Sequence, residues 1–142
     1  MPDYTIVSAD WVRDRDSLAY VRRKVFIDEQ GVPEEMEWDA DDPASLHVLA
    51  RDGSGQPIGC ARLLPDGHIG RMAVLPAWRG RGVGRALLDA VIRAAQARGD
   101  VLVRLSAQTH ATGFYARAGF VAEGDAYDEA GIPHVAMHRK LA

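Results

Sequence analysis

The 142-residue sequence has one cysteine, no apolar run of the ~18 residues that cross a bilayer, and no excess of positive charge. Because Cys60 stands alone, an internal disulfide is excluded and a cysteine-based metal site is not expected. A formal net charge of −3 argues against non-specific nucleic-acid binding, which needs a basic surface. The first residues also lack the basic start and apolar stretch of a signal peptide. We therefore expect a cytoplasmic protein that binds neither membrane nor nucleic acid and holds no metal.

Alternating strand and helix patterns predict one mixed α/β domain over residues 1–142. Alternating apolar residues bounded by glycine- or proline-containing turns predict strands over 4–7, 46–51, 57–64, 68–75, 101–106, from 121, and over 134–141. Helical periodicity predicts helices over 14–30, after the glycine-rich segment 79–84, and over 111–118. The middle helix is expected to bury Ala86, Leu87, Ala90, Val91 and Ala94. The acidic stretch 34–43 is predicted to be a loop anchored by Trp38.

The most informative segment is the loop Arg79-Gly80-Arg81-Gly82-Val83-Gly84-Arg85. It lies between a strand and a helix, where unpaired N–H groups and the helix dipole attract phosphate. Glycine lets the backbone approach an anion, and arginine adds charge-assisted bonds. The nucleotide triphosphatase loop is excluded because no Gly-Lys-Ser/Thr follows, and the GxGxG spacing does not match the dinucleotide fingerprint GxGxxG. A different phosphate-binding loop is therefore expected.

The pattern Arg79-x-x-Gly82-x-Gly84, after a strand ending in Met72-Ala73-Val74, resembles the acetyl-CoA loop of the GNAT superfamily of N-acetyltransferases. The segment 114–120 is similar to that superfamily's FYxxxGF helix, and the order of elements matches along nearly the whole chain. The early stretch 25–33, which ends in Glu29-Gln30-Gly31-Val32-Pro33, is similar to one bacterial subgroup. The resemblance implies a mixed, mostly antiparallel sheet of six to seven strands, about four helices and a splayed central parallel pair.

The same resemblance implies which residues hold acetyl-CoA as co-substrate. The loop amides would cradle the pyrophosphate, and by position they belong to Arg79, Gly80, Arg81, Gly82, Val83, Gly84 and Arg85. The preceding strand would end at a bulge and leave Met72, Ala73 and Val74 beside the pantetheine arm. Gln108 and Phe114 are expected to contact the coenzyme as well, and the thioester would lie between Met72 and Ser106.

Tyr115 matches the superfamily's usual general acid. A phenol of pKa ~10 can lend a proton to the departing thiolate, although a tyrosine here could also only pack on the sheet. The general base is open, because the strand over 68–74 contains no carboxylate. Glu29, His47, His110, His134 and a water chain are the alternatives.

The acceptor is expected opposite the coenzyme. By resemblance, its pocket would be lined by Arg22, Phe26, Glu29, Gln30, His47, Arg62 and Arg71. Arginines and carboxylates on opposite walls would suit a small zwitterion, whereas the acidic stretch could draw in a polyamine or a lysine side chain. Alternatively, Arg62 and Arg71 pair structurally with that acidic stretch. Cys60 is interpreted as a small core residue that could border the pocket, not as a nucleophile.

These expectations define a single acetyl-CoA-dependent N-acetyltransferase domain. It would transfer the acetyl group to a primary amine of a small molecule by direct attack in a ternary complex. Two other functional classes are alternatives to this interpretation. One is a catalytically silent acetyl-CoA sensor on the same scaffold, and the other is a non-enzymatic interaction domain. Relatives often dimerise through their last strands, so the oligomeric state is left open and a homodimer is one alternative.

Overall fold

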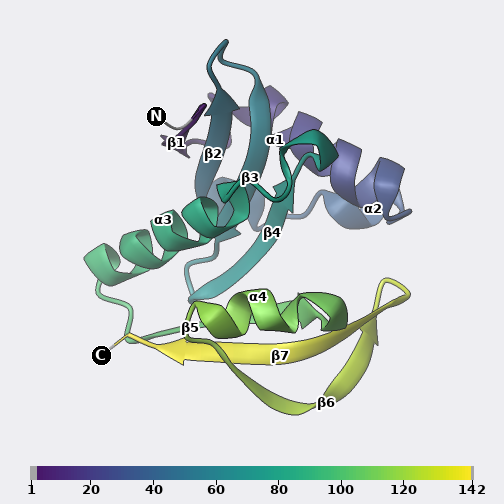
Figure 1. Ribbon diagram of the computed structural model, residues 1–142, viewed down its shortest axis with the longest axis vertical. Helices are drawn as coiled ribbons and strands as arrows, with labels where there is room; N and C mark the ends of the chain where they lie inside the picture. Colours follow the sequence, from purple (N-terminus) through teal and green to yellow (C-terminus); the bar gives the residue numbers. More distant parts are fainter. Residues whose placement is uncertain (1–2, 142) are drawn as a thin grey trace.

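A computed structural model describes residues 3–141 and folds them around one seven-stranded sheet (Figure 1). The spatial order is β1-β2-β3-β4-β5-β7-β6. The strands are β1 (Tyr4–Ala9), β2 (Leu46–Asp52), β3 (Pro57–Leu63), β4 (His68–Val74), β5 (Leu102–Gln108), β6 (Val121–Glu129) and β7 (Ile132–Lys140). Neighbouring strands are antiparallel except β4 and β5, which are parallel. The predicted mixed sheet is confirmed.

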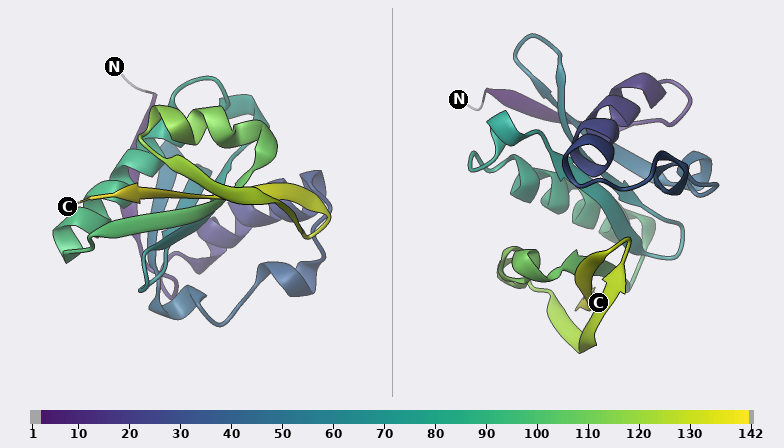
Figure 2. Two further views of the ribbon diagram at one scale, coloured as in Figure 1. Left: turned by 90° about the horizontal axis from the view of Figure 1, so that it is seen from below. Right: turned by 90° about the vertical axis from the view of Figure 1, so that its right-hand side faces the viewer.

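Helices cover both faces of this sheet (Figure 2). They are α1 (Arg15–Arg22), α2 (Glu34–Glu37), α3 (Val83–Arg98) and α4 (Thr112–Arg117). Alternation along β2 divides its side chains between the faces. Val48 and Ala50 join the core under α3, whereas Leu49 packs with the residues of α1. None of the helices within residues 3–141 is long and apolar enough to cross a membrane.

The helix after the glycine-rich segment is bounded by glycines in the left-handed region at both ends. Gly82 has φ 83° before its first residue and Gly99 has φ 92° after its last, a conformation that glycine adopts without steric cost. The predicted periodicity of α3 is confirmed, but the buried face is rotated from the expected one. Ala86, Ala90 and Ala94 are only half-buried. The fully buried set is Val83, Leu87, Leu88, Val91, Ile92 and Ala95.

Two early segments differ from the sequence prediction. The first helix continues beyond α1 as a π-helical segment, Arg23–Glu29, in which the Gln30 amide donates to the Val25 carbonyl, five residues back. The acidic stretch is not an open loop, because it forms α2 and a 3₁₀ turn at Asp42–Ala44. Buried ion pairs, described below, fix a segment whose composition alone indicated a solvated surface.

The parallel pair in the centre of the sheet separates soon after it starts. β4 pairs with β5 only at His68↔Arg104 and Ile69↔Leu105. On its other edge, the register with β3 shifts between Cys60 and Arg62, and Arg71 lies in this bulge with φ 47°. Beyond Ile69, β4 therefore has one edge paired with β3 and one edge open toward β5. This divergence leaves the backbone of Met72 and Val74 facing the gap between β4 and β5.

Candidate functional site

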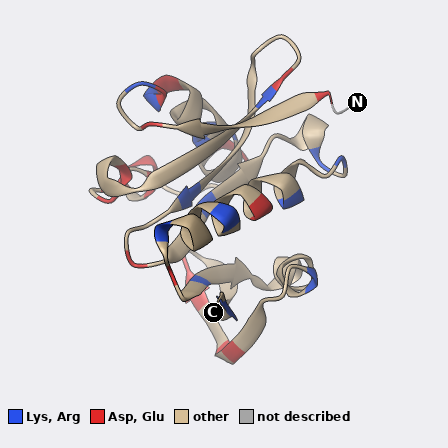
Figure 3. Ribbon diagram, turned by 90° about the vertical axis from the view of Figure 1, so that its left-hand side faces the viewer, with Lys and Arg blue, Asp and Glu red and all other residues tan. Residues whose placement is uncertain are grey.

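The loop between β4 and α3 presents a row of backbone amides. Within the described chain, none of the N–H groups of residues 80–85 donates a hydrogen bond, and no side chain caps α3. The first bond of the helix is the Ala86 amide to the Gly82 carbonyl, at 3.0 Å. Figure 3 shows the arginines of the loop beside the start of α3. Open amides, the helix dipole and basic side chains together form a site suited to a phosphate group.

The arginines of the loop have different partners. Arg81 stacks over the Trp78 ring, 4.7 Å from its centroid, and Arg85 pairs with Asp89 one turn along α3. Arg79 is already bonded through its whole guanidinium. It donates to both carboxylate oxygens of Glu29 at 2.7 Å and to the Val74 carbonyl at 3.0 Å. The side chain of Arg79 therefore fastens the loop to the first helix, and its amide already donates to the Pro76 carbonyl at 3.3 Å.

The open edge of β4 lies next to this loop. The Leu75 amide donates to Ile58 on β3, so alternation directs the backbone groups of Val74 away from β3, toward β5. Met72, two residues earlier, shares that direction. Ala73 points its methyl group the other way, into the core under α1. The structure therefore brings Met72 and Val74 to the gap and places the side chain of Ala73 behind it.

The aromatic pair of α4 packs between the loop and the sheet. Phe114 lies against the start of α3, where a Cβ added at Gly84 would be 3.4 Å from its ring. Tyr115 contacts Phe114 and Phe120 edge-on, with ring centroids 5.1 and 6.1 Å away. No hydrogen bond from its hydroxyl to a residue of the described chain contributes to its environment, which is set by burial alone. Burial raises the pKa of the Tyr115 phenol, so the group stays protonated at neutral pH.

A polar chain occupies the end of β5 on the side of the first helix. Gln108 donates to the Gln30 side chain at 3.0 Å, and His110 donates through Nε2 to the Gln108 side-chain oxygen at 2.7 Å. These bonds join Gln30 and Gln108, which the sequence assigned to acceptor and coenzyme respectively. The Nδ1 atom of His110 has no partner among residues 3–141.

One residue of this region was missed by the sequence reasoning. The Tyr127 hydroxyl of β6 bonds the Ser106 hydroxyl, and its ring stacks on His134 of β7. His134 donates through Nδ1 to the Ile132 carbonyl, and its Nε2 lies 3.4 Å from Glu129. The available signal was the hairpin over 121–140, whose register pairs Tyr127 with His134.

Three residues predicted to line the acceptor pocket instead lie inside the fold. Arg22 is 1% exposed, and its guanidinium lies 5.2 Å from each of the Trp11 and Trp38 ring centroids. It donates to Glu37 at 2.8 Å and to Asp42 at 2.7 Å. Arg62 bonds Asp39 at 2.8 Å and Asp42 at 3.0 Å. Burial favours a raised pKa for Asp42, but the hydrogen bonds and charges of both arginines outweigh it and leave that pKa lowered.

His47 is the third of these residues. Its ring stacks on Trp11, its Nε2 donates to the Asp42 carbonyl at 2.9 Å, and burial lowers its pKa. The alternative interpretation is correct for the arginines, because Arg62 and Arg71 both pair with the acidic stretch. We no longer expect Arg22, His47 or Arg62 to touch an acceptor.

The remaining candidates divide between core and surface. Phe26 is half-buried beside the residues of α1, and Glu29 is held by Arg79, whose hydrogen bonds lower the Glu29 pKa. Cys60 is fully buried and donates to the Arg71 carbonyl at 3.3 Å. Burial raises the pKa of its thiol to about 12, so it remains a neutral core residue.

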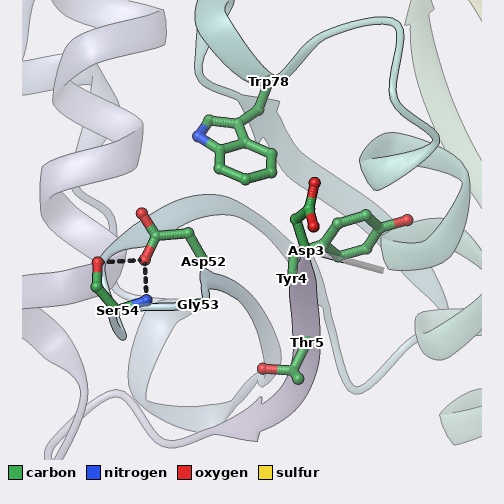
Figure 4. Close-up of a pocket in the computed structure, with 7 residues that line it drawn as sticks. All are labelled: Asp3, Tyr4, Thr5, Asp52, Gly53, Ser54 and Trp78. Carbon is green, nitrogen blue, oxygen red and sulfur yellow. Dashed lines mark hydrogen bonds between the residues drawn. The ribbon is translucent and has the colours of Figure 1, made fainter. Parts of the chain in front are cut away.

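A pocket of about 580 Å³ lies on the other side of the loop, beside Trp78 (Figure 4). It is lined by Asp3, Tyr4, Thr5, Asp52, Gly53, Ser54 and Trp78. Two carboxylates disfavour a phosphate there, and Asp52 is occupied by bonds to Ser54 and Gln56 in the β2–β3 turn. We therefore place the candidate site at the β4–β5 gap and the open amides.

Comparison with known proteins identifies the family of the chain. The acetyltransferase (GNAT) domain model matches residues 7–141, and a curated relative, the uncharacterized N-acetyltransferase YjcF of Bacillus subtilis, is 38% identical over 83% of this chain and 86% of its own length. The chain belongs to the GNAT acetyltransferase family. Among GNAT structures, an acyl-CoA N-acyltransferase of Pseudomonas aeruginosa is 32% identical, with a TM-score of 0.84 over 96% of this chain and 99% of its own. The ElaA protein of Escherichia coli is 29% identical, with a TM-score of 0.85 over the same shares. Membership of the GNAT family supports acyl transfer as the chemistry of the chain.

Proposed function

We propose that this GNAT protein transfers the acetyl group of acetyl-CoA to a primary amine of a small molecule. The observation that carries the proposal is the row of unbonded amides at residues 80–85, placed at the mouth of the β4–β5 gap. The amides would hold the pyrophosphate. The open edge of β4 would pair with the pantetheine arm through the Met72 backbone and the Val74 amide, since the Val74 carbonyl already accepts from Arg79. Family membership supports the same donor, since its reaction is acyl transfer.

Tyr115 is the proposed general acid. The amine would attack the thioester carbonyl carbon directly, forming the new C–N bond as the C–S bond breaks. The sulfur leaves as a thiolate and takes the phenolic proton. A phenol whose pKa is raised by burial remains protonated over the working pH range, which suits this role.

The arriving amine must first lose a proton, and the structure narrows the candidates for the base. His47 is buried and bonded, and Glu29 is weakened as a base by Arg79. His110 bonds the Gln108 side-chain oxygen through Nε2 and has no partner for Nδ1 in residues 3–141, whereas His134 bonds the Ile132 carbonyl through Nδ1 and faces the Glu129 carboxylate through Nε2. We propose that one of these two histidines, or water bound beside them, accepts the proton.

The acceptor pocket is proposed on the side of the first helix, next to Gln30, Ser106 and Tyr127. These side chains supply amide and hydroxyl groups instead of paired charges. Their chemistry suits a polar amine held by hydrogen bonds, and it replaces the zwitterion clamp first expected from Arg62 and Arg71.

The deciding experiment mixes the purified protein with acetyl-CoA and a library of primary amines while free thiol is followed. Thiol release that depends on one amine, together with mass-spectrometric detection of its acetylated product, supports the proposal. Calorimetric binding of CoA without turnover of any amine would identify a silent sensor. Absence of CoA binding would overturn the donor site itself.

A further inference from the structure

The bulge of β4 contains an arginine in a backbone conformation that usually belongs to glycine. Arg71 has φ 47°, in the left-handed region, where a residue with a Cβ is disfavoured by about 1–2 kcal/mol. Glycine would adopt this conformation without that penalty. An arginine at this position indicates that its side chain contributes something that glycine cannot.

The Arg71 side chain is held from several directions. Its Nη2 donates to the Glu37 carbonyl at 3.1 Å and to Asp39 at 3.1 Å, and its Nε lies 3.2 Å from the Glu37 carboxylate. The planar guanidinium fork suits this multiple attachment, which a lysine could not reproduce.

The two carboxylates that bind Arg71 are each held by a second arginine. Glu37 also accepts from Arg22 at 2.8 Å, and Asp39 accepts from Arg62 at 2.8 Å. Together with Asp42, these residues form a network of three arginines and three carboxylates, which we call the acid clamp: Arg22, Glu37, Asp39, Asp42, Arg62 and Arg71. Because its members are mostly buried, the clamp is a rigid anchor for the bulge.

The conformation of Arg71 decides where the next amide points. The Arg71 carbonyl accepts from the Cys60 thiol at 3.3 Å, on the side of β3. In a trans peptide the N–H points opposite to the C=O, so the Met72 amide points toward the gap between β4 and β5. That amide is a donor at the place where the proposed thioester carbonyl would lie.

We propose that Arg71 is a positioning residue: the acid clamp holds its left-handed kink and so directs the Met72 amide at the thioester carbonyl oxygen. This proposal rests on the proposed function for the identity of the thioester. It replaces the expectation that Arg71 touches the acceptor, and it gives the acidic stretch a role in donor geometry.

The test uses Arg71→Gly, which keeps the backbone conformation available but removes the clamp. The protein has four methionines, so selective ¹⁵N-methionine labelling yields a simple spectrum in which Met72 reports the bulge and the buried Met137 reports the fold. Arg98→Ala is the matched control, because Arg98 also bonds an acid, Asp100, and a backbone carbonyl, far along the sequence from the bulge.

In the ligand-free Arg71→Gly variant we expect the Met72 resonance to move or broaden while Met137 stays in place. Calorimetry with acetyl-CoA and with CoA should show that the preference for acetyl-CoA falls about fivefold, the net effect of one hydrogen bond. Arg98→Ala should change neither quantity. Asp39→Asn, which keeps the shape but removes a charge, should give an intermediate result.

An unchanged Met72 resonance in Arg71→Gly would overturn the positioning role. The role would also be overturned if the Met72 resonance moves but the ratio of the dissociation constants for CoA and acetyl-CoA is unchanged. The conformation of Arg71 would then have no effect on binding of the thioester. If the wild-type protein binds neither acetyl-CoA nor CoA, the proposed donor site is wrong. The ligand-free spectrum of Arg71→Gly still tests whether the acid clamp holds the bulge. The two failures are therefore distinguishable.

Discussion

Two charged regions of this chain look alike in the sequence and behave oppositely in the fold. The loop 79–85 exposes arginines between glycines and leaves the amides of residues 80–85 without a partner in the described chain. In the acidic stretch, by contrast, Glu37, Asp39 and Asp42 pair with the buried arginines Arg22 and Arg62. The difference lies in the neighbours. Glycines permit an open backbone, whereas Trp11 and Trp38 enclose Arg22 and exclude water. Charge density alone does not identify a binding site; backbone amides without partners do.

The largest effect is expected from Asp42→Ala, which tests whether the buried ion pairs of the acidic stretch stabilise the fold. The change leaves Arg22 buried without one of its two carboxylates, and breaking a buried pair costs about 3–5 kcal/mol. Chemical denaturation should show this loss as a lower midpoint at unchanged slope.

The matched control is Asp89→Ala, which removes the carboxylate of the half-exposed Arg85–Asp89 pair. We expect a loss of less than about 0.5 kcal/mol, as for surface pairs on a helix. Equal losses in both variants would show that burial does not distinguish the two regions.

The next largest effect is expected from Gly82→Asp. A carboxylate at the start of α3 would repel the pyrophosphate and occupy the open amides, so the Kd for CoA should rise more than about 100-fold, or 2.7 kcal/mol. Isothermal calorimetry measures this directly.

Gly55→Asp serves as its control. Gly55 shares the positive φ of Gly82 and lies in the β2–β3 turn with nothing within 4 Å of an added Cβ. CoA affinity should be unchanged in this variant. A comparable weakening in both would mean that backbone strain, not charge at the loop, explains the result.

Tyr115→Phe tests the chemistry at the gap instead of the binding. We expect kcat to fall about 100-fold, the lower end for general acid catalysis, with the Kd for acetyl-CoA unchanged. In the wild type the activity should persist as the pH rises toward the raised pKa of Tyr115 and then decline. If kcat is unchanged in Tyr115→Phe, Tyr115 is not the general acid and contributes only to packing.

The smallest expected effect concerns His47, behind the acid clamp. Burial lowers its pKa in the fold, so the unfolded chain binds the proton more readily. Stability should therefore fall as the pH drops below about 6.5, by at most about 1.4 kcal/mol per pH unit. Thermal unfolding between pH 7 and 5.5 measures this slope.

His47→Gln can keep the bond to the Asp42 carbonyl without titrating, so the slope should flatten. The exposed His110, changed to Gln, is the comparison variant. If the slope survives in His47→Gln, another group is responsible.

Much of the fold could be predicted because its signals are local. The glycines at 82 and 99 and the apolar periodicity between them defined α3, although the phase of its buried face was wrong at three alanines. The loop and the FYxxxGF helix were informative because backbone amides and short motifs carry their chemistry in consecutive residues.

The acid clamp was not predictable in the same way. Arg22 lies 15 residues from Glu37 and 20 from Asp42, and their pairing depends on how the first helix rests on the sheet. On a helical stripe, Arg22 looked like the wall of a pocket. Tyr127 escaped notice for a related reason, since its contact with Ser106 joins β6 to β5, two strands that are not neighbours in the sheet because β7 lies between them.

The π-helical segment Arg23–Glu29 has its own consequence for protein engineering. A π-helical turn contains about one residue more than an α-helical turn, so removing one residue here would restore regular winding and shift the end of the first helix. Glu29 would swing off the guanidinium of Arg79, and Gln30 would leave Gln108. The alignment of the first helix with both the donor loop and β5 thus depends on a single surplus residue.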